Sequence, residues 1–176
     1  MILELSKEKK ISMSKQITTR PTKSSDIDGM VSLSRSKRLE YEKAQPQFWR
    51  YAGEAGDNAQ EKWFKELLED KNYLMFTAAS NTQEILGFVI GRLMHAPEVY
   101  DPGGLTLMID DFCMKSENLW ESVGNKLVEV IKFEAKSRGA SQILVVCGAH
   151  DYTKRQFLKE QNLSIASEWF VGNIND

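Results

Sequence analysis

Apolar and polar residues alternate along this chain in two different periods, and together they predict a mixed series of strands and helices. Short β-branched or apolar runs predict strands at 16–20, 73–79, 84–94, 105–114 and 142–147, with a final strand or pair of strands within 163–174. Apolar residues at helical spacing predict helices near 24–39, 57–70, 117–138 and 151–161.

The segment from Leu105 to Leu127 is the most informative part of this pattern. An apolar strand there leads to two adjacent carboxylates, Asp110 and Asp111, and then through a short polar turn into an amphipathic helix. The first turn of a helix has unpaired N–H groups and a partial positive charge, so such a turn suits a phosphate. The next strand, 142–147, is continuously apolar, which predicts burial on both faces and a right-handed βαβ unit with parallel strands.

These elements predict an α/β (α+β) domain with one twisted, mixed sheet of six to seven strands and helices on both faces. A chain of 176 residues fits a single domain, which we expect to span 15–176 after an extension at 1–14. The expected order is β-α-α-β-β-β-α-β-α-β, without internal repeats.

Composition narrows the possible partners. A formal charge of −2 gives no basic surface for nucleic acid, and a small cationic substrate fits this balance better. No apolar run is long enough for a transmembrane helix, so we expect no membrane partner and a cytoplasmic location. Cys113 and Cys147 lie in apolar runs and are expected to be reduced core thiols. His95 has no second ligand at metal spacing, so we expect no metal site.

Two short motifs point to a known family. The first is the stretch Ile109-Asp110-Asp111-Phe112-Cys113-Met114 with its spacing to Gly124, and the second is the segment 151–163. Together they resemble the GNAT superfamily of N-acetyltransferases, and motif A is closest to the spermidine/spermine N-acetyltransferase branch. The chain departs from the family pattern at Leu119, where the family has arginine or glutamine, and at Leu158, where it has tyrosine. Trp120 and Ser122 replace family glycines.

The resemblance implies acetyl-CoA as cosubstrate, bound where two parallel strands splay apart. Backbone groups around Phe112, Cys113 and Met114 would pair with the pantetheine, and Cys113 would be a core residue rather than a nucleophile. Backbone N–H groups of the following turn would hold the pyrophosphate, namely those of Leu119, Trp120, Glu121, Ser122, Val123, Gly124 and Asn125.

Acetylation of an amine requires a base, because an alkyl ammonium is almost fully protonated at neutral pH. Asp110 is the first candidate, and Asp111 is expected to be structural unless the roles are exchanged. Adjacent strand residues point to opposite faces, so a β-bulge is expected here. Tyr152 is a candidate acid for the departing thiolate, or else an ordinary surface tyrosine.

The sequence therefore predicts an N-acetyltransferase that moves an acetyl group directly to a small cationic amine, such as a polyamine, a diamine, an amino acid or an aminoglycoside. The alternative is a GNAT-fold protein that binds a ligand or partner without catalysis. Trp49, Glu98 and Tyr100 are expected to line the substrate pocket, although Trp49 has core packing as its other interpretation. A homodimer is a further expectation.

Overall fold

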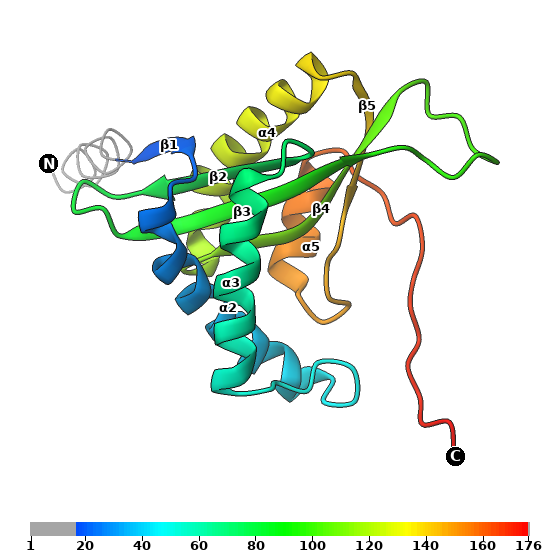
Figure 1. The fold of residues 1–176 in the computed structure, drawn as a ribbon. Coiled ribbons are helices and arrows are strands. Elements are labelled where there is room, and N and C mark those ends of the chain that lie inside the picture. The colour runs from blue at the N-terminus through cyan, green and yellow to red at the C-terminus, as the bar shows by residue number, and fades with distance from the viewer. Residues whose placement is uncertain (1–16, 176) are drawn as a thin grey trace, which may run out of the picture.

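The computed structural model describes residues 17–175, so the expected extension at 1–14 lies outside the described residues. A single sheet has the strand order β1-β2-β3-β4-β5 (Figure 1). Its strands are β1 (Thr18–Pro21), β2 (Tyr73–Ala79), β3 (Ile85–Met94), β4 (Leu105–Met114) and β5 (Ala140–Val145). The first four strands are antiparallel, while β4 and β5 are parallel neighbours. The mixed sheet and the parallel β4–β5 pair are thus confirmed.

Helices cover both faces of this sheet, as predicted (Figure 1). The helices α2 (Ile27–Ala44) and α3 (Glu54–Glu69) pack on one face. On the other face lie α4 (Asn125–Ser137) and α5 (Tyr152–Glu160). Each face has its own core, because the apolar residues of every strand alternate between the two sides. Ile27, Phe64 and Phe88 are fully buried on the first face, and Leu127 and Ile131 on the second.

The strand count is a correction. The described residues form five strands rather than six or seven, because 164–175 make no strand and run as an extended arm. The strand 142–147 was also expected to be buried on both faces. As β5 it is the edge of the sheet, so Ser141 and Gln142 are exposed and Leu144 is 37% exposed.

Two helices differ in detail from the predicted ranges. Helix α3 begins at Glu54, after Gly53, and not near 57. Asp57 is buried in its second turn, where its Oδ2 accepts hydrogen bonds from Arg35 (2.5 Å) and from the hydroxyl of Tyr51 (2.7 Å). On α4 the apolar side chain of Phe133 is 75% exposed.

The end of β4 has the two irregularities that position the candidate site. Asp111 lies opposite Ile90 and Ile109 lies opposite Gly91, so Asp110 is the extra residue of a β-bulge, as predicted. Pairing between β4 and β5 ends at Ile109, whose carbonyl accepts a bond of 2.9 Å from Val146 N. Beyond this point β4 pairs only with β3. We call this opening, bounded by 110–114 and 146–148, the fork.

Candidate functional site

The two adjacent acids meet different charges at the fork. Asp110 is an exposed residue whose carboxyl is partly buried. This partial burial raises the pKa of Asp110, the charge of Arg92 lowers it, and the pKa is raised overall. Asp111 is half-buried, and burial raises the pKa of its carboxyl to about 6. Lys154 and Arg38 oppose that rise, whereas Asp110 adds to it. Asp111 therefore has a pKa near neutrality, which is the range that suits a general base.

Lys154 is a buried cation beside Asp111. Its residue is 4% exposed, and its Nζ lies 5.8 Å from the centroid of the Phe112 ring. Burial raises the pKa of the Cys113 and Cys147 thiols, which lie on the two sides of the fork, and the charge of Lys154 partly opposes that rise. The sequence motifs did not single out Lys154. The sequence did contain a signal for its burial. Residues 154, 157 and 158 share one face of the predicted helix, and 157 and 158 are apolar, so that face is the buried one.

The start of α5 is joined to α2 across the fork. Asp151 caps α5, with Oδ1 accepting a bond of 3.1 Å from the N–H of Lys154 and Oδ2 a bond of 2.9 Å from the Tyr41 hydroxyl. Burial, followed by the charge of Asp151, raises the pKa of Tyr41. The Tyr41 ring packs edge-on against His150 at 4.4 Å and against Trp49 at 5.1 Å. Trp49 therefore belongs to an aromatic wall that adjoins this cluster.

Three other predicted site residues lie elsewhere. Glu98 and Tyr100 are exposed in the connection between β3 and β4, which joins the opposite end of β4 from the fork. The six residue-to-residue steps from Leu105 to Asp111 span roughly 20 Å of strand. Tyr152 begins α5 but is 79% exposed, so its side chain lies in solvent.

The turn expected to hold phosphates is tightly wound. A 3₁₀ turn at Glu117–Leu119 continues into a π-helical segment at Trp120–Gly124 and then into α4. Carbonyls at 116 and 117 already accept the N–H groups of Leu119 (3.1 Å) and Trp120. Glu121 and Ser122 are exposed.

Aromatic packing holds this turn against the core. The Trp120 ring lies 4.8 Å from Phe112 and 5.0 Å from Phe157, and Trp120 is 3% exposed. A Cβ at Gly124 would meet Trp120 at 3.1 Å and Phe157 at 3.2 Å. Core packing therefore explains the glycine at position 124, and a ligand cannot contact this buried position.

Acetyl-CoA fits one part of the site better than the other. The β5-facing edge of 110–114 has no strand partner, so it can pair with an extended amide chain such as pantetheine. The turn at 117–124, which was expected to hold the pyrophosphate, has fewer free N–H groups than the first turn of an ordinary α-helix. Cys113 is buried, and burial raises the pKa of its thiol to about 12, which fits a core residue.

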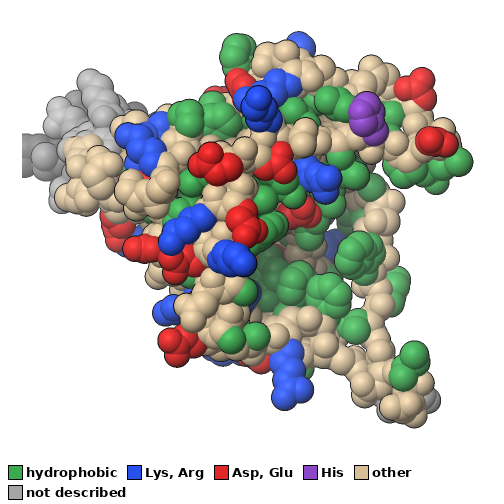
Figure 2. Space-filling model, in the orientation of Figure 1, with side chains coloured by type: hydrophobic (Ala, Val, Ile, Leu, Met, Phe, Trp, Pro, Cys, Tyr) green, Lys and Arg blue, Asp and Glu red, His purple; other side chains and the backbone are tan. Residues whose placement is uncertain are grey.

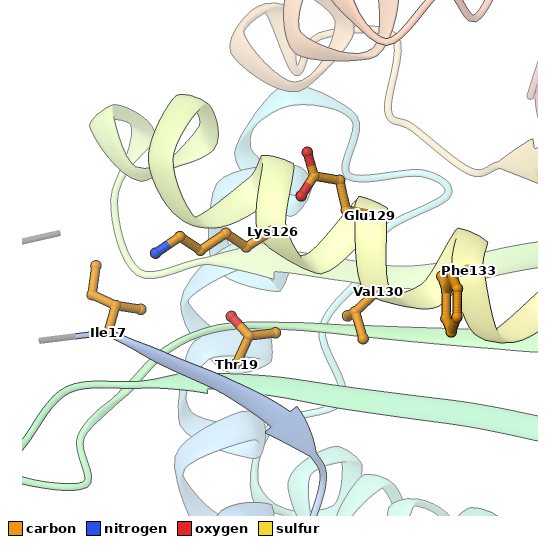
Figure 3. A pocket seen from close by; sticks show the side chains of 6 residues that line it. All are labelled: Ile17, Thr19, Lys126, Glu129, Val130 and Phe133. Atoms are coloured by element: carbon orange, nitrogen blue, oxygen red, sulfur yellow. The ribbon is translucent and has the colours of Figure 1, made fainter. Parts of the chain in front are cut away.

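A cavity lined by side chains near β1 and on α4 lies apart from the fork. It measures about 480 Å³, and Figure 3 shows its side chains between β1 and α4. They are Ile17, Thr19, Lys126, Glu129, Val130 and Phe133. Within residues 17–175, no three His, Cys, Asp or Glu side chains gather as metal ligands, and no helix is both long and apolar enough to cross a membrane.

Solved structures place this fold among acetyltransferases, although no protein-family model and no curated protein matches the sequence. A mutant of the BH1408 protein from Bacillus halodurans has a TM-score of 0.77 at 12% identity, over 89% of this chain and 99% of that one. A predicted acetyltransferase from Clostridium acetobutylicum, solved with acetyl-CoA, has 0.69 at 17%, over 90% and 97%. An aminoglycoside 6'-N-acetyltransferase from Acinetobacter baumannii has 0.67 at 10%, over 90% and 99%. The chain therefore shares the fold of these three proteins.

Proposed function

We propose that this chain is an acetyl-CoA-dependent N-acetyltransferase that acts on a small cationic amine. The observation that carries the proposal is Asp111, a half-buried carboxyl with a pKa of about 6. It lies at the fork, where the edge of β4 is unpaired. A base of this kind beside a free strand edge is what direct transfer from a thioester to an amine requires.

Acetyl-CoA would supply the activated acetyl group as a thioester. The β4 edge around Phe112, Cys113 and Met114 would hold its pantetheine. Leu119 and Trp120 already use their N–H groups, and Val123 is fully buried. The exposed donors of the first turn would therefore be those of Glu121 and Ser122. The side chain of Asn125 is engaged within the same turn, where its Nδ2 donates to the Glu121 carbonyl at 2.6 Å.

We assign the base to Asp111 and not to Asp110, the reverse of the order expected from the sequence. Asp111 would accept the proton of the substrate ammonium at its carboxylate. The Lys154 ammonium lowers the pKa of Asp111, so it keeps a larger fraction of that base ionised near pH 7. Asp110, exposed on the bulge near Arg92, would help to attract the cation.

The substrate class rests on the surroundings of the fork. The acids at 110 and 111 favour a cation, and the rings of Tyr41 and Trp49 can receive an alkyl ammonium by cation–π contact. A polyamine of the spermidine type, a diamine, an amino acid and an aminoglycoside all meet this description. A cytoplasmic location remains part of the proposal.

A second function is a protein of this fold that binds a ligand without catalysis. Two observations favour it: the N–H groups of Leu119 and Trp120 are used within the turn, and Leu158 occupies the place of the family tyrosine. The absence of the tyrosine counts for less because Lys154 lies one turn before Leu158 on α5. Lys154 is a cation that could stabilise a departing thiolate.

The deciding experiment is release of CoA thiol from acetyl-CoA with a panel of amines, followed by mass spectrometry of the amine. We expect one or more amines to gain an acetyl group. Binding of acetyl-CoA without turnover of any amine in the panel would favour the non-catalytic function instead.

A further inference from the structure

Lys154 is a buried cation whose charge has no protein partner. The residue is 4% exposed, and its backbone N–H donates to Asp151 Oδ1 at 3.1 Å. Its Nζ forms no hydrogen bond or ion pair with any residue that the structure describes, and the Phe112 ring at 5.8 Å is a weaker partner than an anion. A cation that is buried without an anion is costly, so this position suits a bound anion.

Asp111 is the opposite charge at the same opening, and it is also unpaired. Within 17–175 its carboxylate accepts no hydrogen bond and joins no ion pair. The two charges are nevertheless near each other, because the charge of Lys154 lowers the pKa of Asp111. A half-buried acid and a buried cation thus lie at the fork without touching, and a ligand that satisfies both must have a cationic and an anionic end.

The other charged groups around the fork already have partners. Asp110, on the bulge, is exposed to water and lies within the influence of the Arg92 charge. A second ammonium in the fork would therefore meet cations without finding another free buried acid among the described residues. The paired groups are Lys37 with Glu40 (2.7 Å), Arg38 with Asp57 (3.5 Å), Asp151 with the Tyr41 hydroxyl (2.9 Å) and Arg155 with the Ala149 carbonyl (3.0 Å).

A hollow in the surface lies on this part of the molecule. Figure 2 shows it between the body and the C-terminal arm, with acidic and basic side chains among hydrophobic ones around it. In the orientation shared with Figure 1 the hollow lies over α5, the helix that carries Lys154. The rings of Tyr41 and Trp49 adjoin the same cluster, so apolar surface is available beside the two charges.

We propose that the substrate is an amino acid, whose ammonium meets Asp111 and whose carboxylate pairs with Lys154 Nζ. This inference rests on the proposed function and narrows its substrate class to zwitterions. A single ammonium matches the single charge of a carboxylate, whereas a phosphate monoester carries nearly two charges at pH 7. Diamines and polyamines are disfavoured, because they bring a second ammonium and no acid to the buried cation.

The transfer then forms an amide and releases CoA. Asp111 takes one proton of the ammonium and later returns it to solvent. The free amine bonds the acetyl carbon, and the carbon–sulfur bond of the thioester breaks with its electron pair on sulfur. The second proton that the nitrogen loses ends on that sulfur, so the products are an N-acetylamino acid and CoA.

The first test compares amino acids with their primary amides, which keep the shape but lose the negative charge. The pairs are leucine with leucinamide and phenylalanine with phenylalaninamide, and putrescine serves as the diamine. In the parent chain kcat/KM should be about tenfold or more higher for the acid in at least one pair.

Lys154→Met should reduce this acid-to-amide ratio about tenfold or more, mainly through the KM of the acid. The loss of the Lys154 charge also changes the pKa of Asp111, but that change acts on both members of a pair and cancels in the ratio. Lys159→Ala, an exposed change on α5, is the matched control and should keep the ratio of the parent chain.

The second test measures binding without turnover. With CoA in place of acetyl-CoA, a millimolar amino acid should raise the melting temperature of the parent chain more than its amide does, and Lys154→Met should remove this difference. Amino acids that bind in this way but are never acetylated would support the zwitterion site and overturn the proposed acetyl transfer. Amides or putrescine acetylated at least as efficiently as the amino acids would overturn the zwitterion site and leave acetyl transfer intact. Equal thermal shifts for acid and amide, or a ratio that Lys154→Met leaves unchanged, would also overturn it.

Discussion

Among single residues, Asp111 gives the sharpest expectation for catalysis. Asp111→Asn keeps the shape of the side chain but removes the base, so kcat/KM for the amine should fall by roughly 10²–10⁴. In the parent chain kcat/KM should also fall as the pH drops through about 6, where Asp111 becomes protonated. Steady-state rates between pH 5 and 8 measure both effects.

Asp110→Asn is the matched control for this prediction. Asp110 is exposed, so we expect a smaller loss that appears mainly in KM. A large loss in Asp110→Asn with normal turnover in Asp111→Asn would reverse the assignment of the base.

Lys154 should set the pH at which Asp111 works. The ammonium lowers the pKa of Asp111, so its removal in Lys154→Met must move that pKa upward from about 6. The acid limb of the pH profile of kcat/KM should therefore shift toward higher pH. A lower rate with an unmoved midpoint would mean that Lys154 contributes through packing alone. Lys159→Ala, on the exposed side of the same helix, should leave the midpoint unchanged.

The sequence predicted only part of the candidate site, and the reason is physical. The acid pair and the bulge follow from local pattern, because two adjacent acids on one strand cannot share a face without an irregularity. Asp111 is the proposed base because burial raises its pKa, and that burial comes from elements that pack against β4 only after the chain has folded. Strand periodicity contains no information about that packing.

Among the elements, the joint between β1 and α2 depends on one buried ion pair. Arg20 donates to Asp26 at 2.5 Å and 2.9 Å, and Asp26 also accepts from Lys23 N and Thr77. Burial raises the pKa of Asp26, but these hydrogen bonds outweigh it and the net pKa is lowered. A lowered pKa stabilises the fold above the unfolded value, and this stability is lost as the pH falls through the folded value.

Arg20→Ala should therefore destabilise the fold by about 3 kcal/mol at pH 7, because it leaves a buried carboxylate without its cation. The difference from the parent chain should shrink below about pH 4, where Asp26 takes up a proton in the variant. Urea unfolding followed by circular dichroism measures both values. Lys65→Ala, which breaks the exposed pair with Glu61, is the control and should leave the free energy of unfolding almost unchanged. Equal losses in the two variants would contradict the prediction.

Periodicity predicted most elements because burial of one face imposes it on strands and helices alike. It failed where an element depends on something outside itself. Asp57 has the character of a helix cap, yet Arg35 and Tyr51 bind it in the interior of α3. The arm at 164–175 has strand periodicity, but the chain provides it with no neighbouring strand.

For the whole molecule, the fork is the place where the two helical layers meet. The Tyr41–Asp151 hydrogen bond ties α2 on one face to α5 on the other, and Lys154 and Asp111 lie beside it. A ligand in the fork would contact both layers, so its binding should stabilise the folded state as a unit. The fold is shared with acetyltransferases at low identity, which means that the fork must be tested in this chain directly.

Acetyl-CoA should therefore raise the melting temperature of this protein. Ligand at 100 times Kd adds about 2.7 kcal/mol, or roughly 5–10 °C for a domain of this size. Because the turn at 117–124 uses the N–H groups of Leu119 and Trp120 internally, the pantetheine half should provide most of the effect. Adenosine 3',5'-bisphosphate, which lacks that half, should shift the melting temperature by less than acetyl-CoA at equal concentration. Differential scanning fluorimetry measures both ligands, and no shift with millimolar acetyl-CoA would rule out the proposed cosubstrate.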